Sequence, residues 1–201
     1  MIYQKFAKRF LDLTIAVIAL PFFFLLCVIV IPLIKLEDRG SAFYIAKRLG
    51  MKGRSFDMYK FRSMVPNAPD IRLEDGSTYN AADDARLTKI GRFLRKTSLD
   101  ETPQLINVLK GDMSIVGPRP DLPSQRSLYT GSDYLKLDVR PGITGYSQAY
   151  YRNAIPWKQR LKHDAYYTQH VSFTLDVRIV LKTISTVISG RSVFIEKGSP
   201  K

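Results

Sequence analysis

The sequence has few of the residues that form disulfides or zinc sites. Its 201 residues include one cysteine and two histidines. Cys27 lies inside an apolar run, so no intrachain disulfide forms, and a cysteine-histidine zinc site of any familiar kind is excluded. The sequence also lacks a Walker loop and a G-x-G-x-x-G pattern. Phosphate binding by a glycine-rich loop therefore has no support.

Acidic residues are scarce beside basic ones. The chain has 18 aspartates and glutamates against 31 lysines and arginines, for a net charge of +13. This surplus implies an anionic partner, which is nucleic acid, a phosphorylated substrate or acidic lipid headgroups. A long apolar segment and the lack of a recognition motif count against a nucleic-acid-binding protein.

Residues 13–34 contain no charged side chain. As a helix this run measures about 33 Å, which is enough to cross the core of a bilayer. Pro21 near its middle predicts a kink. Basic residues, among them Lys8 before the run and Lys35 after it, favour the cytoplasmic side for both ends. Two topologies stay open, a straight spanning helix and a re-entrant helix that kinks at Pro21.

The remainder of the chain predicts a small α+β domain that is mainly helical. We therefore divide the chain into a basic flank with a membrane helix at 1–36 and a catalytic domain with interfacial helices at 37–201. Strands at 42–47 and 56–61 predict a short β-hairpin around 50–53. Helices are expected at 86–95, 105–109, 157–169 and 175–188, and loops at 66–85 and 113–145. We interpret the apolar face of the last helix as core packing, with a position on the membrane surface as the alternative.

Asp100 and Glu101 form an acidic pair beside an expected helix start. Either Ser98 and Glu101 make a capping box, or Thr102 is the N-cap with Pro103 at the first helical position. Both arrangements put the pair at the positive end of a helix dipole, where an electrostatic role worth under about 1 kcal/mol each is the alternative to catalysis. A carboxylate placed there near arginine is expected to have a lowered pKa, which makes it a competent nucleophile at neutral pH.

Basic residues are concentrated in the segments around this pair. Taken singly, each arginine is also compatible with a solvated surface. Together, in loops bounded by glycine and proline, they fit phosphate recognition, because arginine offers a planar fork of donors. The acidic pair among them is suited to Mg²⁺, which prefers oxygen ligands and substrate phosphates. The candidate binding residues are Lys60, Arg62, Arg95, Arg119, Arg140 and Arg152.

Taken together, these segments resemble the small monotopic phosphoglycosyl transferases, also called bacterial sugar transferases. The resemblance extends over nearly the whole chain. It rests on the order and spacing of the tracts at 59–64 (YKFRSM), 99–114 (LDETPQLINVLKGDMS), 117–120 (GPRP), 140–145 (RPGITG) and 152–153 (RN).

The resemblance implies a two-step reaction. It implies that Asp100 attacks the β-phosphate of a UDP-sugar and releases UMP, with Glu101 as its partner and Mg²⁺ bound at Asp100. The phosphosugar on the enzyme then passes to polyprenyl phosphate, at the cytoplasmic face of the bacterial inner membrane. This would be the first membrane step of a glycoconjugate pathway, such as exopolysaccharide or lipopolysaccharide synthesis.

The resemblance also bears on the binding residues and the topology. Arg95 matches an arginine of the phosphate-binding region, and Lys60, Arg119 and Arg152 match basic positions of the substrate pocket. The apolar segment matches a re-entrant helix broken at Pro21, although this chain has Leu20 where the family often has serine. Without further N-terminal membrane helices, the chain is expected to be the minimal form. A membrane-tethered scaffold without catalysis is the remaining alternative, and no residue pattern specifies the sugar or an oligomeric state.

Overall fold

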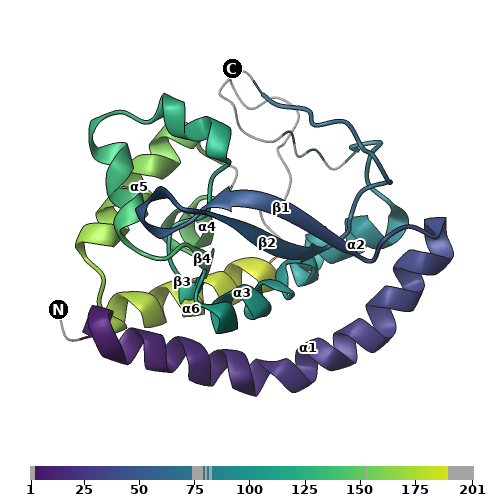
Figure 1. Cartoon of the computed structure of the whole chain (residues 1–201), viewed down its shortest axis with the longest axis horizontal. Coiled ribbons are helices and arrows are strands. Elements are labelled where there is room, and N and C mark those ends of the chain that lie inside the picture. Colours follow the sequence, from purple (N-terminus) through teal and green to yellow (C-terminus); the bar gives the residue numbers. More distant parts are fainter. Residues whose placement is uncertain (1–2, 74–78, 80, 82, 153, 190–201) are drawn as a thin grey trace.

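A computed structural model describes residues 3–73, 79, 81, 83–152 and 154–189. One long N-terminal helix curves along one side of a smaller body of helices and short strands (Figure 1). After a π-helical turn at Tyr3–Ala7, the elements are α1 (Lys8–Asp38), β1 (Phe43–Leu49), β2 (Ser55–Phe61), α2 (Lys89–Thr97), α3 (Gln104–Lys110), β3 (Ser114–Val116), β4 (Gly142–Thr144), α4 (Tyr146–Tyr150), α5 (Trp157–Gln169) and α6 (Phe173–Ile188). The expected α+β class with mainly helical content is confirmed.

The first helix is bent but not broken. It continues through both Pro21 and Pro32, so the break expected at Pro21 is absent. Pro21 lies on the exposed side of α1. Its missing hydrogen bond loosens that outer side, which allows the helix to bend toward the domain (Figure 1). Among the described residues, α1 is the one helix long and apolar enough to cross a membrane.

One face of α1 packs on the domain over the full length of the helix. Its buried residues recur every four or seven positions, as Asp12, Ala16, Phe23, Val30 and Ile34. The apolar members of this stripe join Phe61, Leu94, Leu105 and Val108 in the main core. A single inner face maintained from end to end is the pattern of a helix packed along a body, because each turn returns the same side to the core.

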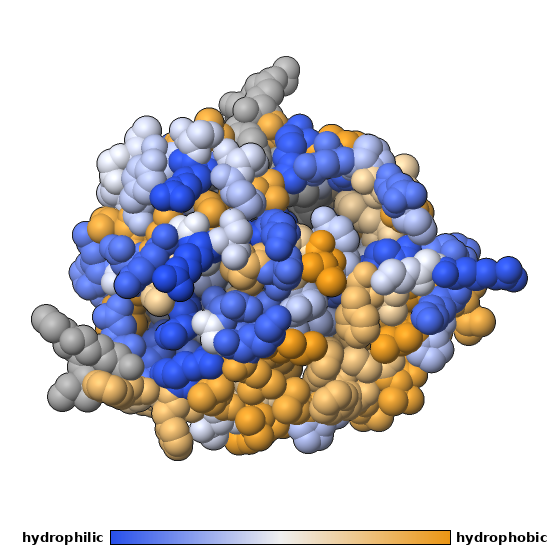
Figure 2. Space-filling model, viewed as in Figure 1, coloured by the Kyte–Doolittle hydropathy of each residue, from blue (hydrophilic) through white to orange (hydrophobic). Residues whose placement is uncertain are grey.

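The opposite face of α1 consists of large apolar side chains without cover. Ile18 and Val28 are 73% and 72% exposed, and Leu36 is 82% exposed. Hydrophobic residues gather along the lower edge of the molecule, over α1, while the surface above is mostly hydrophilic (Figure 2). An apolar surface this continuous marks a protein or membrane interaction site.

The first turns of α1 are fixed to the domain by polar contacts. The carboxylate of Asp12 accepts hydrogen bonds from the Ser114 hydroxyl and from the backbone N–H of Ile115, both at 2.9 Å. Nearby, the guanidinium of Arg9 donates to the carbonyl of Val108 at 2.8 Å, where α3 ends. Buried carboxylates need such partners, so this end of the helix is held in one place.

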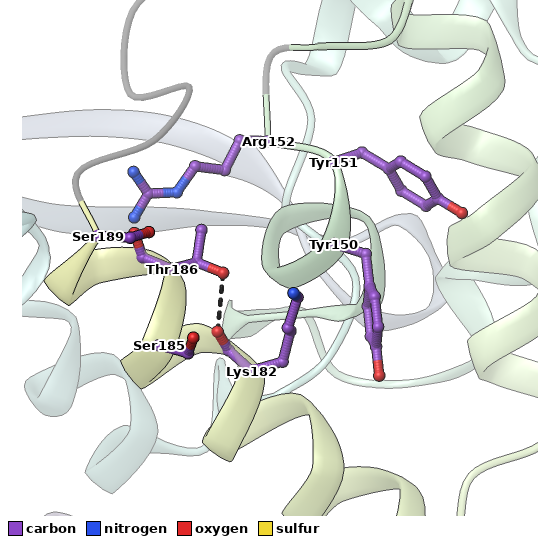
Figure 3. A pocket seen from close by; sticks show the side chains of 7 residues that line it. All are labelled: Tyr150, Tyr151, Arg152, Lys182, Ser185, Thr186 and Ser189. Atoms are coloured by element: carbon purple, nitrogen blue, oxygen red, sulfur yellow. Dashed lines mark hydrogen bonds between the residues drawn. The ribbon is translucent and has the colours of Figure 1, made fainter.

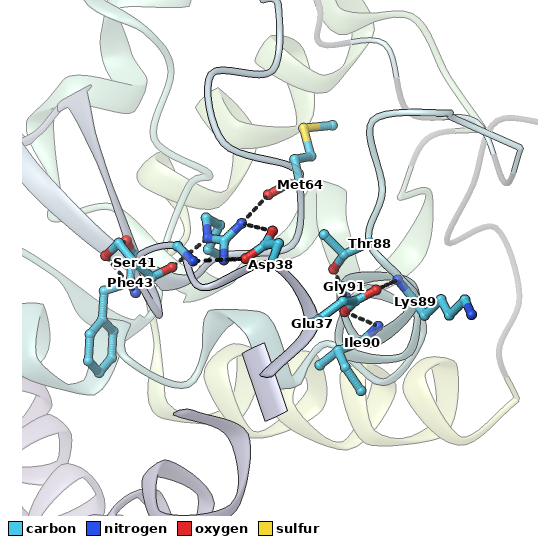
Figure 4. A network of polar contacts seen from close by, with 11 residues as sticks. Glu37, Asp38, Ser41, Phe43, Met64, Thr88, Lys89, Ile90 and Gly91 are labelled. Atoms are coloured by element: carbon cyan, nitrogen blue, oxygen red, sulfur yellow. Dashed lines mark hydrogen bonds and ion pairs between the residues drawn. The ribbon is translucent and has the colours of Figure 1, made fainter. Parts of the chain in front are cut away.

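The last turn of α1 is fixed to the same domain (Figure 4). Glu37 accepts from the backbone N–H groups of Lys89 and Ile90, at 2.6 and 3.1 Å, and so supplies acceptors for the first turn of α2. Asp38 binds the guanidinium of Arg62 through both carboxylate oxygens. Both ends of α1 are thus joined to one body.

The predicted hairpin is confirmed, and it is tied to α3. Strands β1 and β2 pair antiparallel from Phe43 with Phe61 to Leu49 with Ser55. Asn107 of α3 is fully buried against the outer edge of β2. Its side chain accepts from the N–H of Tyr59 at 3.0 Å and donates to the carbonyl of Asp57 at 2.7 Å. The amide thus makes the hydrogen bonds that a neighbouring strand would make at that edge.

The other expected helices are present with shifted bounds. The helix expected at 86–95 begins at Lys89, because Thr88 caps it by accepting from the N–H of Gly91, while Arg86 pairs with Asp84 upstream. The helix expected at 105–109 occupies Gln104–Lys110 and ends at Gly111 as predicted. The helix expected at 157–169 has those bounds as α5.

The long loop expected at 113–145 contains structure that its sequence conceals. Strands β3 and β4 pair parallel, Ser114 with Gly142 and Val116 with Thr144. A Cβ atom on Gly142 would lie 2.1 Å from the backbone nitrogen of Gly117, so only glycine permits this approach. Of the loop expected at 66–85, residues 74–78, 80 and 82 lie outside the described residues, as do residues 190–201 of the expected catalytic domain.

Helix α6 corrects our interpretation of its apolar face. Ile179 is fully buried, and Leu175 and Val180 pack beside it. A second apolar stripe is between 39% and 81% exposed, and consists of Phe173, Val177, Leu181, Ile184 and Ile188. Only one narrow side of the helix packs in the core. Our prediction of core packing is therefore wrong for the exposed stripe, and a position on the membrane surface is favoured.

The Arg62 contact generates a test of what fixes α1. Arg62→Ala should lower the free energy of unfolding by about 2–3 kcal/mol, since it leaves the carboxylate of Asp38 without its partner in a largely buried place. Denaturant unfolding in detergent measures the loss. Arg92→Ala, which removes an exposed arginine from α2, should change stability by less than about 0.5 kcal/mol. Equal effects from the two variants would show that the ion pair does not hold the helix.

Candidate functional site

The acidic pair lies in a tight turn between two helices. Helix α2 ends at Ser98, which adopts the left-handed conformation with φ of 59°. Leu99–Glu101 then form a 3-10 turn that precedes α3. Neither expected cap forms. Thr102 has helical φ and ψ of −59° and −31°, which an N-cap does not adopt.

The capping box with Ser98 is absent because Glu101 has other partners. Its carboxylate accepts from the ammonium of Lys60 at 2.6 Å and from the guanidinium of Arg119 at 3.1 Å. Lys60 comes from β2 and Arg119 from the loop after β3. Burial raises the pKa of Glu101, but the two cations outweigh it and lower that pKa to about 2. Glu101 is therefore an anion that holds three separate segments together.

Asp100 lies in a different environment one residue away. It is 7% exposed. Within the described part of the chain, no group donates a hydrogen bond to its carboxylate. Burial raises its pKa to about 6, the charge of Glu101 adds to this rise, and Lys60, Arg95 and Arg119 oppose it.

The raised pKa of Asp100 is the reverse of the lowered one expected from the sequence. The expected lowering assumed a helix N-terminus with arginine aimed at the carboxylate, whereas the cations bind Glu101 and the turn supplies no donor. With a pKa of about 6, the carboxyl is still about nine-tenths ionised at pH 7. Neighbouring carboxyls with opposite shifts are typical of residues that have different chemical roles.

Three of the predicted basic residues gather around the pair. Lys60 and Arg119 bind Glu101 directly. Arg95, in the last turn of α2, donates from Nε to the hydroxyl of Ser63 at 2.9 Å, and its charge acts on Asp100. The group is rich in donors for phosphate oxygens.

Arg152 lies at the border of the group. The charge of Glu101 acts on its guanidinium, although burial is the larger influence and lowers its pKa. Its side chain lines a pocket between α4 and α6 (Figure 3). The structure therefore relates Arg152 to the pair through the charge of Glu101.

Two predicted binding residues lie elsewhere, in structural contacts. Arg62 follows the last residue of β2 and pairs with Asp38 of α1. Arg140 donates from Nε to the carbonyl of Gly111 at 2.9 Å, just past the end of α3. Both side chains thus bind acceptors of the scaffold, and their assignment to substrate binding stays a prediction.

Sequence reasoning missed Arg48, near the end of β1. Burial and the charge of Arg119 lower its pKa to about 10. One buried nitrogen, Nη1, has no hydrogen-bond partner among the described residues. A signal was present, because the two-residue period of a strand puts Arg48 on the same face as the buried Ala46. Two neighbouring arginines with an unsatisfied donor fit an anionic ligand.

The number of carboxylates at the site limits which metal ion it can bind. No group of three or more His, Cys, Asp or Glu side chains capable of holding a metal occurs within the ranges that the structure describes. A closed protein cage for zinc or calcium is thus not formed there. Asp100 alone fits a cation that takes one carboxylate and completes its shell with substrate phosphates and water, which is the habit of Mg²⁺.

Comparison with known families decides the assignment. The family described as bacterial sugar transferase matches residues 3–190. The chain belongs to the bacterial sugar transferase family. This bacterial sugar transferase is accordingly an enzyme, and the resemblance read from its tracts is confirmed.

Three relatives show how far the similarity extends. The uncharacterized sugar transferase EpsL of Bacillus subtilis is 40% identical over 92% of this transferase and 89% of its own length. The exopolysaccharide production protein ExoY of Sinorhizobium fredii is 39% identical over 94% and 88%. The UDP-N-acetylgalactosamine-undecaprenyl-phosphate N-acetylgalactosaminephosphotransferase of Aeromonas hydrophila is 41% identical over 92% of this chain but 44% of its own length. This transferase thus spans most of two relatives and less than half of the third.

The raised pKa of Asp100 predicts how stability depends on pH. The folded state keeps this proton up to about pH 6, whereas an unfolded aspartate loses it near its ordinary pKa of 3.8. The contribution of Asp100 is therefore fully present below about pH 4 and is lost as the pH rises toward 6. Asp100→Asn should raise the free energy of unfolding at pH 7 and flatten this part of the curve.

Denaturant unfolding in detergent between pH 4 and 8 measures the effect. The exposed Asp138→Asn is the matched control and should leave the curve in place. If Asp100→Asn destabilised the transferase at pH 7, the carboxylate would be making favourable contacts, and the raised pKa would be wrong.

Proposed function

We propose that this transferase moves a phosphosugar from a UDP-sugar to polyprenyl phosphate, with Asp100 as the nucleophile. The observation that carries the proposal is that two adjacent carboxylates have different contacts and opposite pKa shifts. Glu101 is neutralised by Lys60 and Arg119, while Asp100 is largely ionised at pH 7 and receives no hydrogen bond from a described residue. The name of the Aeromonas relative contains both a UDP-sugar and undecaprenyl phosphate, which supports the two substrate classes.

In the first step Asp100 displaces UMP. A carboxylate oxygen of Asp100 attacks the β-phosphorus of the donor, and the bond from that phosphorus to the bridging oxygen breaks. UMP leaves with the bonding electrons, and the phosphosugar stays on Asp100. Lys60 and Arg119 neutralise the charge that gathers on the phosphoryl oxygens.

The donor diphosphate is assigned to two arginines. Arg119 is 44% exposed and uses one nitrogen for Glu101, so further donors remain for a phosphate. Arg48 supplies the buried nitrogen that has no partner among the described residues. Glu101 acts by positioning, because it keeps Lys60 and Arg119 beside Asp100.

In the second step the acceptor regenerates the enzyme. A phosphate oxygen of polyprenyl phosphate attacks the phosphorus held on Asp100. The bond from that phosphorus to the aspartate oxygen breaks, which restores the carboxylate. The product is a polyprenyl diphosphate sugar, so both displacements occur at the same phosphorus.

Mg²⁺ is the proposed cofactor. Asp100 would hold it together with oxygens of the donor diphosphate, since no residue in the described ranges donates a hydrogen bond to this carboxylate. When bound, the ion neutralises charge on the diphosphate and on the departing UMP. Lys60 and Arg119 supply the remaining positive charge near the diphosphate.

The proposed location is the cytoplasmic face of the bacterial inner membrane, with α1 re-entrant. Two observations support it. The outer face of α1 and the exposed stripe of α6 are apolar. Both ends of α1 are joined to one domain, through Asp12 at one end and Asp38 at the other. A helix spanning the bilayer would pull that domain into the lipid, so both ends are proposed to lie on one side.

A covalent phosphosugar on Asp100 is the decisive chemical test. With a UDP-sugar, Mg²⁺ and no acceptor, the purified enzyme should release about one UMP per active site and gain the mass of a phosphosugar on the peptide containing Asp100. Asp100→Asn should abolish both, and EDTA should suppress the release until Mg²⁺ is restored. Mass spectrometry and nucleotide analysis measure the two products.

The rival mechanisms give different results. Direct attack by polyprenyl phosphate in a ternary complex gives no UMP without acceptor and intersecting initial-rate lines. A membrane scaffold without catalysis gives no UMP under any condition. Asp138→Asn is the matched carboxylate control and should keep the full release.

The re-entrant topology is testable by cysteine labelling. Single cysteines at Gln4 and Lys35, in a Cys27→Ser background, should both resist a membrane-impermeant reagent in intact cells, because both would face the cytoplasm. Both should react after the cells are opened, which checks that the sites are accessible. Labelling of the Gln4 position alone in intact cells would establish a spanning helix.

A further inference from the structure

A pocket lies between the end of α4 and the second half of α6 (Figure 3). Its volume is about 380 Å³. The lining residues are Tyr150, Tyr151, Arg152, Lys182, Ser185, Thr186 and Ser189. Arg152 extends over Thr186 and Ser189 from one side, and Lys182 rises from α6 on the other (Figure 3). The pocket is therefore bounded by two cations from different segments.

The lining matches an anion with several oxygens. Its described lining residues include two cations and several hydroxyl groups, and none of them is acidic. Lys182 lies 5.8 Å from the ring centre of Tyr150, and no carboxylate pairs with it in the described part of the chain. Thr186 is held by its hydrogen bonds to the carbonyls of Ala149 and Lys182, which fixes α6 against α4. Charged donors on a fixed frame are typical of phosphate sites.

The surface of α6 beside the pocket is apolar, so a ligand that covers both needs an apolar part. At about 100° per residue, Ser185 and Ser189 lie next to the exposed stripe that contains Leu181, Ile184 and Ile188. Leu181 and Ile188 are 62% and 81% exposed. One flank of the helix thus offers hydroxyls and a cation, and the adjoining flank offers an apolar track. A ligand that fits both has a phosphate head and a hydrocarbon tail.

One residue of the pocket is related to the acidic pair by charge. Arg152 lines the pocket, where burial lowers its pKa and the charge of Glu101 opposes this. It follows α4 and adopts a left-handed conformation with φ of 46°, so its side chain turns back toward α6 (Figure 3).

We propose that this pocket holds the phosphate of polyprenyl phosphate, with Lys182 as a binding residue and the apolar stripe of α6 as the track for its tail. The proposal rests on the proposed function and assigns a place to the acceptor. A nucleotide donor has no hydrocarbon tail and gains nothing from the stripe. Inorganic phosphate lacks the tail as well, so the two sources of a phosphate group are distinguishable.

The two half-reactions test the assignment separately. Lys182→Ala should leave the release of UMP without acceptor unchanged, and should raise the KM for polyprenyl phosphate about tenfold, the effect of losing one charge-assisted hydrogen bond. Arg178→Ala removes an exposed cation of the same helix outside the pocket and should change neither value. Lys182→Arg should restore most of the acceptor affinity, and unaltered thermal unfolding checks the fold of each variant.

A binding measurement keeps the test independent of turnover. In lipid nanodiscs, a short prenyl phosphate should bind the wild-type enzyme more tightly than the matching prenol or inorganic phosphate, and Lys182→Ala should remove this advantage. A raised KM for the UDP-sugar in Lys182→Ala would assign the pocket to the donor and overturn the proposal. Unchanged acceptor binding would overturn it as well. Absence of UMP release from the wild type would instead refute the proposed function, while prenyl phosphate binding still decides the pocket.

Discussion

The site depends on the two cations that bind Glu101. Lys60 belongs to the hairpin, Glu101 to the turn between α2 and α3, and Arg119 to the loop after β3. A buried carboxylate without these partners would be costly, so the three segments are stable only when they meet. Because these cations bind Glu101, no described residue donates a hydrogen bond to Asp100, although their charge still opposes the rise of its pKa. The environment of one carboxylate thus follows from the contacts of its neighbour.

A second constraint is the packing of α1 on the domain. Its inner stripe meets the same core that contains Leu94 and Leu105, the residues on either side of the dyad. The helix that presents an apolar face outward therefore also packs against the helices that flank the turn with the acidic pair. This arrangement sets the depth of Asp100 relative to the apolar surface, which suits chemistry between a soluble substrate and a lipid.

Much of this could be predicted from the sequence, and the failures have physical causes. The hairpin, the end of α3 at Gly111 and the bounds of α5 follow from local patterns. The β3–β4 pair was missed because three-residue strands far apart in sequence carry no periodic signal. The scaffold contacts of Arg62 and Arg140, with Asp38 and a backbone carbonyl, were not predicted because they are set by tertiary packing. The predicted shift in the pKa of Asp100 was wrong in direction for the same reason, since the shift depends on which carboxylate binds the cations.

The contacts of Asp12 have a consequence for how the protein is made. Asp12 is buried in α1, and its hydroxyl partner, Ser114, comes 102 residues later in the sequence. During synthesis the apolar helix leaves the ribosome long before that partner exists. In the proposed location at the membrane, the carboxylate would have to stay in contact with water until Ser114 and Ile115 arrive. The start of the helix would then remain at the surface while the rest of the chain is completed, so one acidic residue would order assembly in time.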